Sequence, residues 1–170
     1  MELKVKLMDG APLPRHAKPG DAGMDLTTRE KVSLAPGETV TVGTGVAVEI
    51  PDGYVGLVFP RSGLGARGIN LSNCVGVIDS GYRGEIKVPL HNNHHVDNVL
   101  VNMGEDVFGA EFPLRVKLKG ESMTVERGER VAQLVVVPVV QVECMQVDEL
   151  SDSERGSGGF GSSGRVELAE

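Results

Sequence analysis

Asp79 is the residue of this chain whose surroundings best suit acid–base chemistry. It stands in NCVGVIDSGYRGEIKVPLHN, residues 73–92, between two apolar-rich stretches that are joined by the turn sequence from Asp79 to Tyr82. Two strands joined in this way predict a β-hairpin. A carboxylate at the mouth of a rigid hairpin can take a proton from a water molecule. The alternative is an ordinary turn aspartate with a structural role.

A second candidate site lies in FPRSGLGARGIN, residues 59–70. The stretch after Arg61 is consistent with one or two helical turns, and the first N–H groups of a helix can bind an anion. Arg61 itself carries a guanidinium fork that matches a phosphate group. Arg61, Ser62 and Gly63 are therefore candidate phosphate contacts.

The glycine- and serine-rich segment ERGSGGFGSSG, residues 154–164, holds one arginine and one aromatic ring. It contains G-x-G-x-x-G, a pattern that binds dinucleotides only between a strand and a helix. Nine residues follow Gly161 in the sequence, so we exclude that interpretation. Composition alone predicts a flexible terminus.

The elements that must position these groups are short strands. Alternating apolar residues predict strands in 3–7, 40–42, 46–50 and 86–90, and short β-rich apolar runs predict buried strands in 54–59 and 131–140. Turn sequences such as APGE and PDG separate them. We expect an all-β fold: a sandwich, a jelly roll or a barrel.

The same pattern suggests how the chain is divided. We expect residues 1–150 to form a single β domain and residues 151–170 to form a flexible C-terminal arm. The polar segment 92–127 reads as an elaborated hairpin, with a strand pair around PLRVKLKG and SMTVERG.

Composition limits the partners. The 170-residue chain has a formal net charge of −7 and no run of Lys and Arg, so we expect no binding to nucleic acid. No apolar run approaches the roughly 18 residues of a membrane span. The cysteines, Cys74 and Cys144, show no disulfide pattern, which suits a reducing cytosol. We therefore expect a cytoplasmic protein without a membrane partner.

The candidate sites belong to a longer ordered series of motifs. In chain order these are AGMDL (22–26), PRSGL (60–64), GVIDSGYRGEI (76–86), GERVAQL (128–134) and RGSGGFGSSG (155–164). Together they resemble the five motifs of the trimeric dUTPase family, the deoxyuridine triphosphate nucleotidohydrolases. The resemblance implies a distorted jelly-roll or β-barrel-like subunit and a homotrimer whose active sites are each assembled from three subunits. It also implies Mg²⁺-dependent hydrolysis of dUTP to dUMP and pyrophosphate.

The resemblance assigns roles on the nucleoside side. Asp79 matches the general base that activates the attacking water. Tyr82 matches the residue that packs on deoxyribose and leaves no room for a 2′-hydroxyl. The residues expected to contact or cover uracil are Asn73, the backbone near Gly84 and Ile86, and the ring of Phe160.

On the phosphate side the resemblance assigns contacts to Arg61, Ser62, Gly63, Gln133, Arg155, Ser162 and Ser163. The substrate phosphates and water molecules would supply most ligands of Mg²⁺. No direct protein ligand is therefore expected, and Asp25 and Gln133 would act through water.

The sequence departs from the family pattern in several places. Gly81 stands where many members carry a second acidic residue. The stretch from Leu64 to Gly68 is about one residue shorter than common forms, so we assign no role to Arg67. Ser163 replaces a threonine and keeps the hydroxyl. The 92–127 segment is longer than usual and is either a partner surface or a plain elaboration.

Two other functions stay open. A dCTP deaminase of the same structural superfamily shares the Asp-x-Gly-aromatic turn, but its catalytic glutamate would fall at Pro89, which cannot shuttle a proton. A catalytically silent trimer used for nucleotide binding or regulation would bind dUTP without releasing pyrophosphate.

Overall fold

The computed structural model describes residues 1–8, 10–94, 99–101, 115–117 and 121–158. The chain forms two compact units, residues 1–140 and 141–170. In the described part of the chain, no helix is long and apolar enough to cross a membrane.

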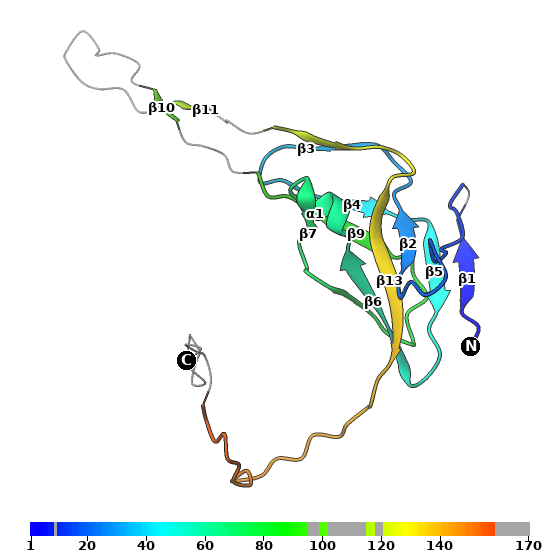
Figure 1. The fold of residues 1–170 in the computed structure, drawn as a ribbon, viewed down its shortest axis with the longest axis vertical. Coiled ribbons are helices and arrows are strands. Elements are labelled where there is room, and N and C mark those ends of the chain that lie inside the picture. Colours follow the sequence, from blue (N-terminus) through cyan, green and yellow to red (C-terminus); the bar gives the residue numbers. More distant parts are fainter. Residues whose placement is uncertain (9, 95–98, 102–114, 118–120, 159–170) are drawn as a thin grey trace, which may run out of the picture. The chain divides into compact units, whose positions relative to one another are not determined.

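The first unit is built almost entirely from short strands (Figure 1). They are β1 (Lys4–Leu7), β2 (Met24–Thr27), β3 (Val32–Leu34), β4 (Thr39–Gly43), β5 (Val46–Glu49), β6 (Tyr54–Pro60), β7 (Ile69–Leu71), β8 (Gly76–Ile78), β9 (Lys87–Asn92), β10 (Val99–Val101), β11 (Arg115–Lys117), β12 (Met123–Val125) and β13 (Arg130–Pro138). One short helix, α1 (Ser62–Ala66), lies between β6 and β7. The expected all-β class is confirmed.

Two sheets carry most of the structure. One has the order β2-β13-β6-β8 and the other the order β4-β9-β7, and all their pairings are antiparallel. In Figure 1 the yellow β13 runs between β2 and β6. The arrangement is a distorted jelly roll, in which alternating side chains of both sheets turn inward.

The core follows the alternation seen in the sequence. In β9 the side chains of Val88, Leu90 and Asn92 are buried, while Lys87 points outward. Thirteen of the seventeen residues in the buried cluster are Leu or Ile or Val from strands β2 to β13, and the largest include Leu26, Leu34, Ile69 and Leu134. Burial of this branched apolar surface is the main stabilising contribution.

Two expected pairings are wrong. The strands on either side of Asp79 do not pair with each other: β8 pairs with β6, and β9 pairs with β4 and β7. The chain reverses there, but its two arms belong to different sheets. In the 92–127 segment, β11 pairs with β10, whereas β12 pairs with β3. Longer-range partners compete successfully with the neighbouring strand in both cases.

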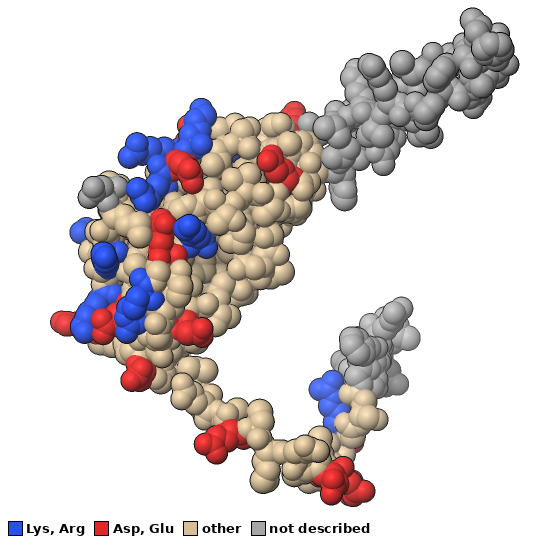
Figure 2. Space-filling view, turned by 180° about the vertical axis from the view of Figure 1, so that it is seen from behind, with Lys and Arg blue, Asp and Glu red and all other residues tan. Residues whose placement is uncertain are grey.

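Charged side chains gather along one side of the face in Figure 2, where Lys and Arg alternate with Asp and Glu. The rest of that face is a broad area of other residues. Charges of opposite sign therefore neutralise one another locally on this face.

Candidate active site

Asp79 occupies the first position of a tight turn at the end of β8. Its backbone carbonyl accepts a hydrogen bond from the N–H of Tyr82 at 3.1 Å, which closes the turn around Ser80 and Gly81. The Asp79 side chain is exposed. The turn therefore presents a carboxylate to solvent from a fixed backbone position.

A cavity of about 310 Å³ lies beside this turn. It brings together four of the residues expected to bind or act on the nucleoside: Asn73, Asp79, Tyr82 and Ile86. The other lining residues are Gly76, Val77, Ile78, Glu85 and Lys87. We call this space the hairpin pocket; its volume is at the lower end of the roughly 300–1,000 Å³ of small-ligand sites.

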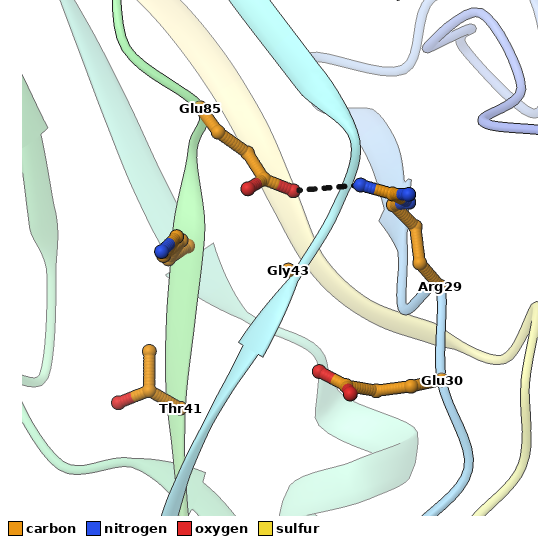
Figure 3. A pocket seen from close by; sticks show the side chains of 6 residues that line it. Arg29, Glu30, Thr41, Gly43 and Glu85 are labelled. Atoms are coloured by element: carbon orange, nitrogen blue, oxygen red, sulfur yellow. Dashed lines mark ion pairs between the residues drawn. The ribbon is translucent and has the colours of Figure 1, made fainter. Parts of the chain in front are cut away.

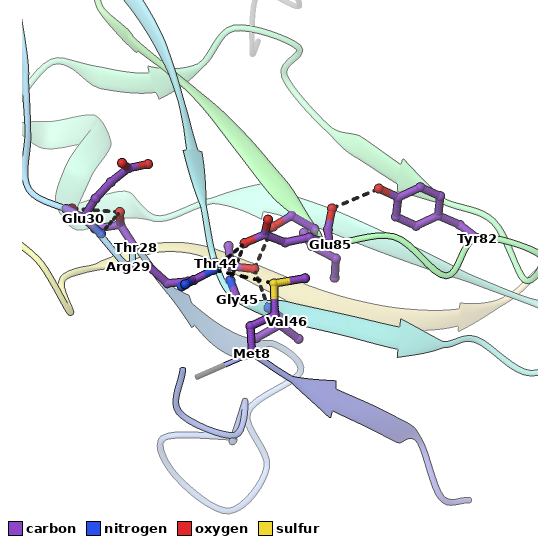
Figure 4. Close-up of polar contacts among 10 residues, drawn as sticks. Met8, Thr28, Arg29, Glu30, Thr44, Gly45, Val46, Tyr82 and Glu85 are labelled. Atoms are coloured by element: carbon purple, nitrogen blue, oxygen red, sulfur yellow. Dashed lines mark hydrogen bonds and ion pairs between the residues drawn. The ribbon is translucent and has the colours of Figure 1, made fainter. Parts of the chain in front are cut away.

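The Tyr82 ring is folded back over Gly84. Its hydroxyl donates a hydrogen bond to the backbone carbonyl of Glu85 at 2.9 Å (Figure 4). A Cβ atom on residue 84 would lie 2.6 Å from Cζ of the tyrosine ring, so only glycine allows this pose. Gly84 therefore acts here by making room for Tyr82.

The backbone of Ile86 is already used within the protein. Its N–H donates to the Val46 carbonyl at 2.8 Å, and its carbonyl accepts from Oγ1 of Thr44 at 2.7 Å. The Ile86 N–H and C=O therefore both take part in hydrogen bonds within the subunit. Ile86 lines the pocket as a side chain that is 1% exposed.

Two strand ends also line the hairpin pocket, at Gly76 and Lys87. Gly76 begins β8, which within the described part of the chain is the last strand of its sheet and pairs with β6. Lys87 begins β9 and pairs with Gly43 of β4. The sequence alone did not indicate that these two positions line the pocket.

A second cavity, of about 370 Å³, contains three of the residues expected near the phosphates: Asp25, Arg61 and Gln133. Strand register explains the grouping, because Gln133 in β13 pairs with Asp25 in β2 on one side and with Phe59 in β6 on the other. Arg61 directly follows β6. We call this space the arginine pocket.

Asp25 is held between two cations. Its Oδ1 lies 2.9 Å from Nε of Arg61, and its Oδ2 lies 3.1 Å from Nη1 of Arg130. The Asp25 side chain is 18% exposed, so these partners are needed to offset its desolvation. The sequence did not single out Arg130; its only signal was its place within GERVAQL.

Gln133 and Gly23 complete this cluster. The Gln133 side chain donates Nε2–H to the Pro60 carbonyl at 3.1 Å. Its Oε1 lies 2.6 Å from where a Cβ of residue 23 would stand, so the glycine of AGMDL leaves room for it. The amide oxygen and the Asp25 carboxylate are hard oxygen donors of the kind that Mg²⁺ accepts directly or through its waters.

The two pockets lie at opposite ends of β6. Ile78, just before Asp79, pairs with Gly56, and Arg61 is five positions further along the β6 chain. At about 3.3 Å per residue this separates them by roughly 16 Å. Within one chain, Asp79 and Arg61 therefore do not meet at one phosphate.

The remaining predicted residues are divided between α1 and the C-terminal segment. Ser62 and Gly63 begin α1 and are exposed, beside the arginine pocket in sequence but not among its lining residues. Arg155 lies in the second unit and donates from Nε to the Gly158 carbonyl at 3.0 Å. Phe160, Ser162 and Ser163 lie outside the described residues.

Comparison with known proteins gives these pockets a family context. The dUTPase family model matches residues 9–107 and 115–164, leaving residues 108–114 of the long polar segment unmatched. The deoxyuridine 5′-triphosphate nucleotidohydrolase of Thermobifida fusca is 49% identical over 96% of this chain and 79% of its own length. That of Alcanivorax borkumensis is 45% identical over 96% of this chain and 95% of its own.

Solved structures point to the same family as the sequence comparisons. The dUTPase of Staphylococcus bacteriophage 80alpha, with dUpNHpp, aligns with a TM-score of 0.79 and 38% identity, covering 96% of this chain and 99% of the phage chain. The residues matched by the family model include the lining of both pockets. The chain belongs to the dUTPase family.

Proposed function

We propose that this protein hydrolyses dUTP to dUMP and pyrophosphate by attack of water at the α-phosphorus, with Asp79 as the general base and Mg²⁺ as the cofactor. The observation that carries the proposal is the hairpin pocket, which gathers Asp79, Asn73 and Tyr82 in one cavity. The related phage structure contains a dUTP analogue. A carboxylate beside the sugar is suitably placed to accept the proton of the attacking water.

The base is read by groups on either side of Asp79. The Asn73 side chain and the backbone near Gly84 and Ile86 contact the uracil edge in this proposal, which the position of Asn73 and Ile86 in the pocket lining supports. Backbone hydrogen bonds to the edge of uracil leave buried polar groups unpaired when cytosine enters, which can cost about 10⁴–10⁵ in kcat/KM. Tyr82, fixed over Gly84, packs on the deoxyribose and excludes a 2′-hydroxyl.

The phosphates are met by the arginine pocket. Arg61 supplies a charge-assisted contact, and Ser62, Gly63 and Gln133 add neutral ones. Asp25 holds the Arg61 guanidinium in place before the substrate arrives. Bound Mg²⁺ would neutralise phosphate charge, with Asp25 and Gln133 holding its water molecules. Local positive charge thus offsets a net charge of −7.

The two pockets can serve one substrate only if they come from different subunits. Their separation of roughly 16 Å along β6 within one chain supports a homotrimer in which a neighbour's arginine pocket faces the hairpin pocket. Exposed apolar side chains support the same assembly. Val140, Val142, Met145 and Leu150 are between 76% and 87% exposed, a density of apolar surface that is typical of an interface.

The third contribution is the C-terminal arm. In this proposal, residues 1–150 form the subunit body and residues 151–170 form the arm that closes over the nucleotide of a neighbour. Arg155 contacts the γ-phosphate, Phe160 covers uracil, and the hydroxyls of Ser162 and Ser163 bind phosphate. Closure excludes water that is not the nucleophile. A cytoplasmic location is consistent with the two exposed free thiols, Cys74 and Cys144.

Pyrophosphate release from dUTP, dTTP, dCTP and UTP with Mg²⁺ tests the proposal. We expect release from dUTP alone at a substantial rate, and loss of that release in EDTA. Formation of dUTP or dUMP from dCTP would instead show deaminase chemistry. Binding of dUTP without pyrophosphate release would show a silent nucleotide-binding protein.

A further inference from the structure

Glu85 lies in the turn region between β8 and β9, and the mechanism proposed above does not use its carboxylate. It lies between Gly84 and Ile86, and its side chain is only 14% exposed. It lines both the hairpin pocket and a separate cavity of about 440 Å³ (Figure 3). That cavity is also lined by Arg29, Glu30, Thr41, Gly43 and Lys87. A carboxylate so little exposed needs partners that offset its desolvation.

Its partners are Gly45, in the bend between β4 and β5, and Arg29, which follows β2. Oε1 of Glu85 accepts the backbone N–H of Gly45 at 2.7 Å, and it lies 3.7 Å from Nη1 of Arg29. The first contact is a charge-assisted hydrogen bond and the second a longer ion pair. Figures 3 and 4 show both side chains reaching toward each other beside β4. The Glu85 side chain thus connects the turn region between β8 and β9 to a bend that lies 40 residues away in sequence.

Two glycines shape this tie. A Cβ on Gly43 would lie 2.7 Å from the Glu85 carboxylate oxygen. Gly45 has a φ of 70°, in the left-handed region, and a Cβ there would lie 2.5 Å from Cδ of Arg29. Gly43 therefore makes room for the Glu85 carboxylate, and Gly45 makes room for the Arg29 side chain.

The tie leads directly to Tyr82. The backbone carbonyl of Glu85 is the acceptor for the Tyr82 hydroxyl, at 2.9 Å. One residue therefore accepts from Gly45 through its side chain and from Tyr82 through its backbone carbonyl. Ile86, the next residue, makes hydrogen bonds with Thr44 of the same bend and with Val46, the first residue of β5.

We infer that Glu85 is a positioning residue: its bond to Gly45 and its ion pair with Arg29 hold the carbonyl that fixes Tyr82 against the sugar. This inference rests on the proposed dUTP hydrolysis and adds a determinant of discrimination between deoxyribose and ribose. Glu85 contacts neither the phosphates nor the attacking water in this scheme. Its loss therefore affects sugar selection and KM more than the chemical step.

The kinetic test compares Glu85→Ala, Glu85→Gln and Arg29→Met with the wild-type protein, on dUTP and UTP. For Glu85→Ala we expect KM for dUTP to rise about tenfold, the effect of losing one hydrogen bond to a charged group. The ratio of kcat/KM for dUTP to that for UTP falls to a similar extent, while kcat changes less than about threefold. Glu85→Gln keeps a hydrogen-bond acceptor for the Gly45 N–H, so its KM for dUTP and its dUTP/UTP ratio should stay close to the wild-type values.

A spectroscopic test reports on Tyr82 without catalysis. The chain has no tryptophan and two tyrosines, Tyr54 and Tyr82, so Tyr82 is the only strong emitter in a Tyr54→Phe background. Adding Glu85→Ala should change the emission of the free protein. Glu126→Ala is the matched control, since it removes a carboxylate paired with Lys31 at 2.7 Å outside both pockets. It should leave emission, KM and the dUTP/UTP ratio unchanged.

Each outcome decides the inference. A Glu85→Ala protein that melts at a lower temperature but keeps its KM, its dUTP/UTP ratio and its Tyr82 emission has lost only stability, and the inference is wrong. If Glu85→Ala does not fold, Glu85→Gln and Arg29→Met are compared by the same readouts, and wild-type values in both overturn it. A wild-type protein that does not hydrolyse dUTP refutes the proposed function instead, and the emission arm still tests the link to Tyr82.

Discussion

The hairpin pocket and the arginine pocket are held by opposite means. In the hairpin pocket Asn73, Asp79 and Tyr82 are exposed, whereas the Glu85 side chain that lines the same pocket is 14% exposed. In the arginine pocket the predicted phosphate ligand, Arg61, is itself tied to a carboxylate at 2.9 Å. In the hairpin pocket Tyr82 is held by a backbone carbonyl, whereas in the arginine pocket the side chain proposed to bind phosphate is held by a carboxylate.

This difference matches what each pocket is proposed to recognise. A base edge is read by directional hydrogen bonds, so its site depends on where backbone groups lie. A triphosphate is recognised mainly by charge, and a preoriented guanidinium avoids reorganisation when the anion arrives. The following predictions test this contrast, from the largest expected effect to the smallest.

Asp79→Asn should have the largest effect, and this effect should be on kcat rather than on KM. The amide cannot accept the proton of the attacking water, so we expect kcat to fall by about 10²–10⁴-fold, with KM for dUTP nearly unchanged. Pyrophosphate release under saturating dUTP measures the first quantity and nucleotide titration the second. Turnover close to wild type would show that Asp79 is not the base.

Removing residues 155–170 should act on turnover through the proposed arm. Loss of Arg155 and of the hydroxyl contacts removes transition-state donors, and we expect kcat to fall by about 10²–10³-fold, as for one oxyanion donor. Circular dichroism and the melting temperature should stay near wild type, since the second unit is separate from the strands of the first. Full activity after truncation would exclude a lid role.

Arg61 and Arg67 lie at the two ends of α1 and give a matched pair. Arg61→Ala should lower kcat/KM for dUTP about 10–100-fold, the value of a hydrogen bond between charged groups. Arg67 pairs with Glu129 and donates to the Thr124 carbonyl, so Arg67→Ala should lower the melting temperature with little change in kcat/KM. The reverse result would move the phosphate contact to the other end of the helix.

Gly84 and Gly81 give a second matched pair, within the hairpin. A Cβ on Gly84 meets the far end of the Tyr82 ring, which can swing away, so Gly84→Ala should cost under about 1 kcal/mol of stability yet raise KM several-fold. Nothing lies within 4 Å of a Cβ on Gly81, so Gly81→Ala should leave KM unchanged. Equal KM values in the two variants would argue that the Tyr82 pose does not matter for binding.

Local patterns in the sequence identified the strands and the motifs but not the contacts between distant segments. Period-two alternation placed β9, and the motif order placed Asp79 and Arg61. By contrast, the pairing of β8 with β6 was missed, because a turn sequence favours the adjacent strand and carries no information about a better partner elsewhere. The Asp25–Arg130 contact spans 105 residues. Such ties depend on the register of assembled strands, which no single segment encodes.

The ion pair between Lys4 and Glu49 on β1 and β5 should have the smallest effect, because it is an exposed counterpart of the buried Glu85 tie. A hydrogen bond from Lys4 and its charge lower the pKa of Glu49 below its ordinary value of 4.5. The folded carboxylate therefore stays ionised at pH values where the unfolded chain has taken up a proton. The contribution of this ion pair to stability is complete above pH 4.5 and is lost as the pH falls through the folded pKa of Glu49.

Glu49→Gln should melt slightly below wild type at pH 7, and the melting temperatures of the two proteins should converge below pH 4.5. A gap that stays constant with pH would show that packing, rather than charge, joins these strands.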